Sequence, residues 1–110
     1  TDKKRNNVYE VINPHKEPDE FIVLVFDNTL FGSCKDFSLF TNKSFWAKDI
    51  NMPLVRYNYS FIKKAEPTGK KLNQLKLYLA DNTIRTFDFS AGKADVVKKH
   101  ADVLNSLCTL

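Results

Sequence analysis

The chain has 110 residues, 43% of them hydrophobic and 13% aromatic, and a net charge of +4. This length supports one domain with its own core, and the aromatic content argues against disorder. No apolar run approaches the roughly 20 residues of a transmembrane helix, and a content of only three Gly and four Pro excludes collagen-like and linker sequences.

The first twenty residues predict a short helix followed by a connector. Val8, Val11 and Ile12 have the spacing of one helical face, and the dipeptide Asn13-Pro14 ends that helix. The connector that follows contains two prolines and four charged residues. We therefore separate an N-terminal segment and connector, 1–20, from a single domain, 21–110.

Short stretches between residues 21 and 89 predict about seven antiparallel strands. The stretch 21–26 is rich in Val, Ile and Phe, which is typical of a buried strand. Hairpin-sized breaks follow, including Asn42-Lys43, a turn at 66–69 and Asp81-Asn82. They are too short for parallel crossovers. The other predicted strands span 37–41, 44–48, 54–57, 59–65, 72–80 and 83–89. The last has one phase slip, which predicts a bulge or a strand with two apolar sides.

The C-terminal stretch 91–108 predicts an amphipathic helix. Its apolar residues are spaced 3, 4, 3 and 4 apart and form one face: Ala94, Val97, Ala101, Leu104 and Cys108. Ser90 is the expected N-cap, and Lys98, Lys99 and His100 are expected to point largely outward. The predicted fold is therefore mainly β with a C-terminal helix, a partly open barrel of about seven strands capped by that helix.

The run Asp27-Asn-Thr-Leu-Phe-Gly-Ser-Cys-Lys-Asp36, the following residues Phe37-Ser-Leu-Phe-Thr-Asn-Lys43 and an aromatic strand with Trp46 resemble bacterial pleckstrin-homology-like (PH-like) domains. The family pattern is an Asp-x-Thr-x-Phe-Gly-Ser-Gly-Lys-Asp-Gly loop before a strand ending in Leu-Thr-Asp/Asn-Lys. Cys34 and Phe37 stand where the pattern has glycine. The resemblance covers 21–107 in element order and implies a binding or scaffolding role without a common catalytic activity. The matching loop positions are Asp27, Thr29, Phe31, Gly32, Lys35 and Asp36.

The net positive charge lies in one short segment. Residues 61–79 hold five lysines against Glu66, and Lys63, Lys64, Lys70 and Lys71 flank the predicted 66–69 turn. Such a basic tip is either a solubilising hairpin end or a weak site for anionic membrane. The absence of an arginine cluster disfavours nucleic acid. The predicted first loop has only Lys35, which disfavours a specific phosphoinositide pocket.

The sequence favours a non-enzymatic protein. The two histidines, His15 and His100, lack metal-ligand spacing with the two cysteines, and no nucleophile or phosphate-loop motif is present. Cys34 is a candidate nucleophile only if a histidine lies beside it. Asp27 and Asp36, which flank the loop, are more typical of turns than of a carboxylate pair. We expect neither metal nor cofactor.

A PH-like sheet has exposed edges that can accept a partner strand. Tyr57, Tyr59 and Phe61 form one stripe if they share a strand, either a core face or a binding face, and Trp46 has the same two interpretations. The sequence thus predicts a protein-interaction or scaffolding module whose partner is another protein or a second copy. The alternative is a peripheral adaptor on anionic membrane. The absence of a signal peptide and the small number of cysteines predict a cytoplasmic protein.

Overall fold

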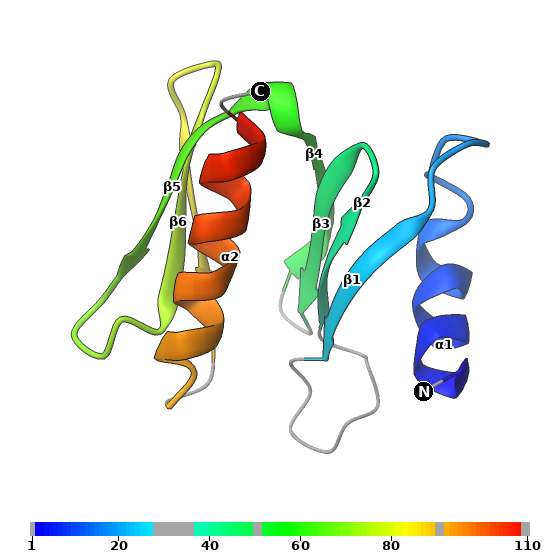
Figure 1. Ribbon diagram of the computed structural model, residues 1–110, viewed down its shortest axis with the longest axis horizontal. Helices are drawn as coiled ribbons and strands as arrows, with labels where there is room; N and C mark the ends of the chain where they lie inside the picture. Colours follow the sequence, from blue (N-terminus) through cyan, green and yellow to red (C-terminus); the bar gives the residue numbers. More distant parts are fainter. Residues whose placement is uncertain (1, 28–36, 50–51, 90–91, 109–110) are drawn as a thin grey trace. The chain divides into compact units, whose positions relative to one another are not determined.

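A computed structural model describes residues 2–27, 37–49, 52–89 and 92–108 (Figure 1). The chain forms two compact units, Thr1–Tyr57 and Asn58–Leu110. The boundary that we predicted after residue 20 is a different division and stays a prediction.

The first unit contains one helix and a four-stranded antiparallel sheet of order β1-β2-β3-β4. Its elements are α1 (Asp2–Ile12), β1 (Ile22–Asp27), β2 (Phe37–Thr41), β3 (Ser44–Asp49) and β4 (Met52–Asn58). The predicted Asn42-Lys43 hairpin joins β2 and β3. It is closed by the Thr41 hydroxyl, which accepts the N–H groups of Lys43 at 3.1 Å and Ser44 at 2.9 Å, a typical use of threonine in turns.

Both faces of β2 are buried, so the sheet has two apolar sides. On one side, Val8 and Ile12 of α1 share a fully buried cluster with Phe37, Leu39 and Trp46, which confirms the helix and the core interpretation of Trp46. On the other side three aromatic rings meet. The centroid of Phe40 lies 6.2 Å from Phe26 and 5.2 Å from Phe45.

The interpretation of 21–26 as a buried strand was wrong. Residues 22–26 belong to β1, at the edge of the four-stranded sheet, and Phe21, Val23 and Leu24 are 56%, 55% and 39% exposed. A shift in register between Ile22 and Leu24 leaves Val23 as a bulge. An uninterrupted apolar run looks the same whether its strand is central or at an edge, so composition alone could not separate the two.

The second unit contains a three-stranded sheet of order β5-β6-β7 and the C-terminal helix. Its elements are η1 (Tyr59–Phe61), β5 (Ile62–Thr68), β6 (Gln74–Leu79), β7 (Ile84–Asp88) and α2 (Ala94–Cys108). Two sequence predictions were wrong here. Residues 59–61 form a single 3-10 turn, which breaks the proposed Tyr57–Phe61 stripe. The stretch 66–68 belongs to β5, and the chain turns at 69–72.

The Asp81-Asn82 hairpin is confirmed. Asn82 has a φ of 70°, the left-handed conformation that asparagine tolerates. β7 pairs with β6 without a shift in register, and Ile84 is exposed whereas Phe87 is buried. The phase slip therefore marks a strand with two apolar sides and no bulge. The bulges lie at Val23 and, from the shift between Ile62 and Lys64, at Lys63.

Helix α2 buries its apolar stripe against the β5–β6–β7 sheet (Figure 1). Val97, Ala101 and Leu104 are buried, as predicted, and so is His100, with no exposed surface. The expectation that His100 points outward was wrong because a residue three positions after Val97 lies on the same helical face. The predicted N-cap Ser90 lies outside the described residues.

Asn105 of α2 holds the open edge of β5. Its side-chain amide accepts a hydrogen bond from the N–H of Ala65 and donates one to the C=O of the same residue, both at 2.8 Å. One side chain thus replaces the backbone pair that a neighbouring strand would supply, a way of covering a sheet edge with a helix.

Candidate interaction surfaces

The predicted loop motif lies mostly outside the described residues. Only Asp27 is described, as the last residue of β1, paired with Phe37 of β2. The other five candidate positions, and Cys34 with its proposed nucleophilic role, fall within 28–36, which the structure does not describe. The motif and Cys34 stay predictions.

The four candidate lysines do not form one tip. Lys63 donates a hydrogen bond to the Asn82 side chain at 3.3 Å, in the turn between β6 and β7, whereas Lys70 and Lys71 lie in the turn between β5 and β6. These two turns are at opposite ends of β6 (Figure 1). Lys64 forms an ion pair with Glu66 at 3.4 Å. The structure thus separates Lys63 and Lys64 from Lys70 and Lys71.

The outer face of the second sheet carries polar side chains around Tyr78. The ammonium groups of Lys64 and Lys76 lie 5.7 Å and 5.1 Å from the centre of its ring, and its hydroxyl donates to Glu66 at 2.6 Å. Glu66 therefore has a pKa below its usual value, chiefly through the Tyr78 hydrogen bond. Positive and negative groups alternate on this face, as on an ordinary solvated sheet.

The exposed edge strand β1 carries apolar side chains and no charge between Phe21 and Phe26. Protein edges usually carry a charge or a proline that prevents pairing with another chain. Here the protection covers only the start of the strand, where the Tyr9 hydroxyl accepts the Ile22 N–H at 3.5 Å and Val23 forms a bulge. Beyond that point Leu24 is exposed and Val25 and Phe26 are half-buried.

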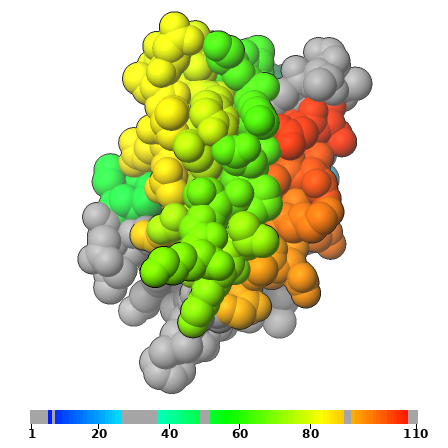
Figure 2. All heavy atoms as spheres, turned by 90° about the vertical axis from the view of Figure 1, so that its left-hand side faces the viewer, coloured from blue at the N-terminus to red at the C-terminus, as the bar shows by residue number. Residues whose placement is uncertain are grey.

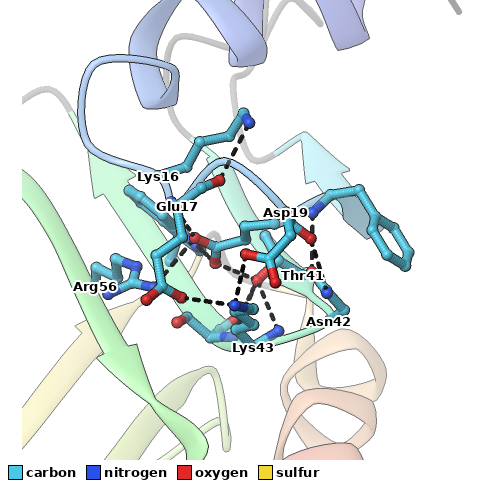
Figure 3. A network of polar contacts seen from close by, with 11 residues as sticks. Lys16, Glu17, Asp19, Thr41, Asn42, Lys43 and Arg56 are labelled. Atoms are coloured by element: carbon cyan, nitrogen blue, oxygen red, sulfur yellow. Dashed lines mark hydrogen bonds and ion pairs between the residues drawn. The ribbon is translucent and has the colours of Figure 1, made fainter.

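A polar network that sequence analysis missed fixes the approach to β1 (Figure 3). The buried carboxylate of Glu20 accepts hydrogen bonds from the Thr41 hydroxyl and from the Trp46 indole N–H at 3.0 Å. It also accepts one from the Arg56 guanidinium at 3.1 Å. The guanidinium lies 5.2 Å from the centre of the Trp46 ring. Through Glu20, the connector is joined to β2, β3 and β4.

The rim of the network is more exposed. Lys43 pairs with Asp19 at 2.6 Å and with Glu17 at 3.2 Å. Asn42 accepts the Phe21 N–H at 2.8 Å and donates to the Asp19 carbonyl at 3.1 Å. These contacts fix the backbone directly before β1, so the edge strand enters the sheet in one defined position.

The network stabilises the negative charge of the Glu20 carboxylate. Burial, the largest single influence, would raise the pKa of Glu20, but the hydrogen bonds from Thr41, Trp46 and the Glu17 backbone and the positive charge of Arg56 together lower it. Glu20 is therefore ionised and fully engaged near neutral pH. No local sequence pattern predicts this cluster, because its members come from four separate segments.

His100 is likewise structural. Its ring packs edge-on against Phe89, with centroids 5.1 Å apart, and its Nδ1 donates to the Val96 carbonyl at 2.7 Å. Burial lowers the pKa of His100 to about 4, so the ring is neutral near pH 7. Among the described residues, no three His, Cys, Asp or Glu side chains gather as a metal ion would require. Neither described helix is long and apolar enough to cross a membrane.

Comparison with solved structures identifies the fold. The chain is similar to a DUF1696 family protein with a pleckstrin-homology domain from Shewanella loihica, with a TM-score of 0.65 and 18% sequence identity. The match covers 94% of this chain and 95% of that one. The chain has a PH-like fold. The predicted fold class is thus confirmed, whereas closure of a barrel end by α2 stays a prediction. No protein-family model and no curated protein matches the sequence.

Proposed function

We propose that this PH-like chain is a non-catalytic protein-interaction module that binds an extended, apolar segment of another protein along the edge of β1. The observation that carries the proposal is the exposure of Phe21, Val23 and Leu24 at the start of an edge strand that has no charged residue before Asp27. Addition of a strand to a sheet edge supplies backbone hydrogen bonds for affinity and side-chain contacts for specificity.

The Glu20 network supports this proposal. It fixes the backbone before β1 through buried, charge-assisted hydrogen bonds, so the edge is held in place before a partner binds. A site that is already ordered loses less conformational entropy on binding. The buried polar side chains are used for structure: Glu20 accepts hydrogen bonds from three side chains, and His100 packs against Phe89.

The test places one charge on the edge and a matched charge elsewhere. Val23→Lys adds a lysine at a bulge that is 55% exposed, and Ile84→Lys adds one on β7, also an edge strand, where Ile84 is 53% exposed. We expect Val23→Lys to abolish co-purification of the partner, because a lysine on an edge strand opposes strand addition. Ile84→Lys should retain it. Circular dichroism should show both variants folded.

Two readouts separate the outcomes. Quantitative capture from a native extract compares the wild type with both variants, and light scattering over a range of concentrations reports whether the wild type assembles with itself. Self-assembly that Val23→Lys alone removes would identify the partner as a second copy. If Val23→Lys binds every wild-type partner undiminished and does not change the oligomeric state, the β1 edge is not the interface.

A further inference from the structure

We propose that the turn between β5 and β6, residues 69–72, docks on the surface of an anionic membrane, with Leu72 entering the interface and Lys70 and Lys71 contacting lipid headgroups. This surface, which we call the 69–72 tip, belongs to the second unit, whereas the β1 edge belongs to the first. It is also smaller than the four-lysine patch that the sequence predicted, because Lys63 and Lys64 have no part in it.

The backbone of the tip carries a strained apolar residue. Leu72 has a φ of 54° and is 53% exposed. Non-glycine side chains are disfavoured in this left-handed region, and hairpins usually place glycine or asparagine there. A leucine that is both strained and exposed to water contributes little to folding. Strain of this kind is concentrated at functional sites.

The tip is nevertheless an ordered turn. The Leu72 N–H donates to the Gly69 carbonyl at 3.1 Å. Gly69 has a φ of 89°, and a Cβ at this position would lie 3.1 Å from the Gln74 side-chain oxygen. These constraints hold the turn in one shape, with Lys70 and Lys71 at its centre, so the apolar side chain and the two charges are presented together.

The charge distribution supports an anionic partner. Residues 58–110 contain nine Lys and Arg against five Asp and Glu, so the second unit carries the entire net charge of +4. Lys64 pairs with Glu66 at 3.4 Å, whereas no described carboxylate pairs with Lys70 or Lys71. Figure 2 faces this sheet, and the 69–72 tip projects from the lower end, opposite the 80–82 turn.

An apolar side chain next to two lysines without a carboxylate partner among the described residues matches a membrane surface better than a soluble phosphate. Lysines near an anionic bilayer contribute about 1 kcal/mol each, and a leucine adds further affinity only where its side chain leaves water. The two contributions can be removed separately, which makes the proposal testable.

The experiment measures co-sedimentation of the full chain with phosphatidylcholine vesicles that contain about one third phosphatidylserine. Two variants remove the same charge from different places: Lys70→Gln/Lys71→Gln and Lys63→Gln/Lys64→Gln. The two pairs are separated by about 20 Å along β5, roughly two Debye lengths at 0.1 M salt. We expect the first variant to lose roughly 30-fold in partition and the second less than about 3-fold.

Leu72→Asn gives an independent readout. Asparagine tolerates the left-handed conformation, so this variant should unfold at a temperature higher than the wild type by about 4 °C. It should also partition into anionic vesicles roughly 3–10-fold less strongly. If Leu72 served only the fold, its replacement by asparagine would not stabilise the protein and weaken vesicle binding at the same time.

Three results would overturn the proposal: no partition of the wild type into anionic vesicles at low salt, equal losses from the two lysine pairs, or undiminished binding of Leu72→Asn. Binding that persists with purely zwitterionic vesicles would also contradict it, because the lysines would then have no ligand. The Val23→Lys variant should bind vesicles like the wild type, so failure of the β1 proposal and failure of this one are distinguishable.

Discussion

Glu20 joins the connector to three strands of the first unit. The carboxylate is buried and is held by Thr41, Trp46 and Arg56. Glu20→Gln removes the charge but keeps the shape, and leaves the guanidinium without its buried partner. We expect the free energy of unfolding to fall by about 2–3 kcal/mol, measured by chemical denaturation.

The control for this prediction is Glu17→Gln. Glu17 contacts the same guanidinium, at 3.5 Å, but its side chain is 52% exposed, and exposed ion pairs contribute little. We expect a change below about 0.5 kcal/mol. Equal effects of the two substitutions would show that burial of the Glu20 carboxylate does not matter to stability.

His100 makes stability depend on pH in mildly acidic solution. Burial lowers its pKa from 6.5 to about 4. Between these values the unfolded chain binds a proton that the folded chain does not, so stability is complete above pH 6.5 and declines as the pH falls to about 4. The loss amounts to about 3 kcal/mol at most. Denaturation at a series of pH values should show this decline in the wild type and not in His100→Leu.

Two checks make this prediction specific. His15→Gln removes an exposed histidine and should retain the wild-type decline. The effect of Glu20 falls in a lower window: because its folded pKa is lowered from 4.5, its contribution is present above pH 4.5 and is lost as the pH falls further. A wild type whose stability does not change between pH 6.5 and 4 would contradict the buried, neutral state of His100.

At the scale of elements, Asn105 joins α2 to β5. Asn105→Leu should cost about 1–3 kcal/mol, because it leaves both backbone groups of Ala65 without their partner. Lys99→Leu, at an exposed position of the same helix, should cost less than about 0.5 kcal/mol. Amide exchange tests the mechanism directly, since Asn105→Leu should lower protection at Ala65 more than at Leu77. Unchanged exchange at Ala65 would show that the Asn105 amide does not guard this edge.

Sequence patterns predicted the elements well because periodicity is a local property. The helical spacing of Val97, Ala101 and Leu104 and the Asn42-Lys43 and Asp81-Asn82 turns correspond to observed elements. The bulges at Val23 and Lys63 and the edge position of β1 depend on which strands become neighbours, and a single sequence does not encode that locally. The burial of His100 was predictable, because a residue three positions after Val97 lies on the same helical face. We expected it to point outward because its side chain is polar.

Interaction surfaces were less predictable than the fold. Counting lysines located the positive charge correctly, but only the turn positions separated Lys70 and Lys71 from Lys63 and Lys64. Leu72 appeared as a strand residue because it continues the leucine pattern of β6, and its positive φ is visible only in the structure. The Glu20 network joins residues as far as 39 positions apart, farther than any local motif reaches.

At the scale of the whole molecule, the net charge belongs to the second unit, whereas the β1 edge belongs to the first. Changing Lys63, Lys64, Lys70 and Lys71 to Glu would reverse the net charge from +4 to −4. Surface charge of this kind affects steering and solubility more than the fold. We expect the quadruple variant to stay folded, to keep the protein partner at moderate salt and to lose anionic vesicles.

Side-by-side capture and co-sedimentation test this separation of the two surfaces. The wild type at matched salt is the control, and the unfolding midpoint reports whether the variant is intact. If a folded quadruple variant lost every partner that the wild type captures, the lysines rather than β1 would be the protein-binding surface.

The amide of Asn105 also has a consequence for aggregation. A strand from another molecule cannot add to β5 at Ala65 while α2 is in place, since the two backbone groups it would need are already bonded. Detachment of the helix would release these groups together with the leucine face of β6, which is the combination that seeds cross-β fibrils. Protonation of His100, which packs against Phe89, weakens the attachment of the same helix to its sheet. Acid therefore favours detachment of α2, and fibril formation, followed by the fluorescence of an amyloid-binding dye, should increase as the pH falls from 6.5 towards 4.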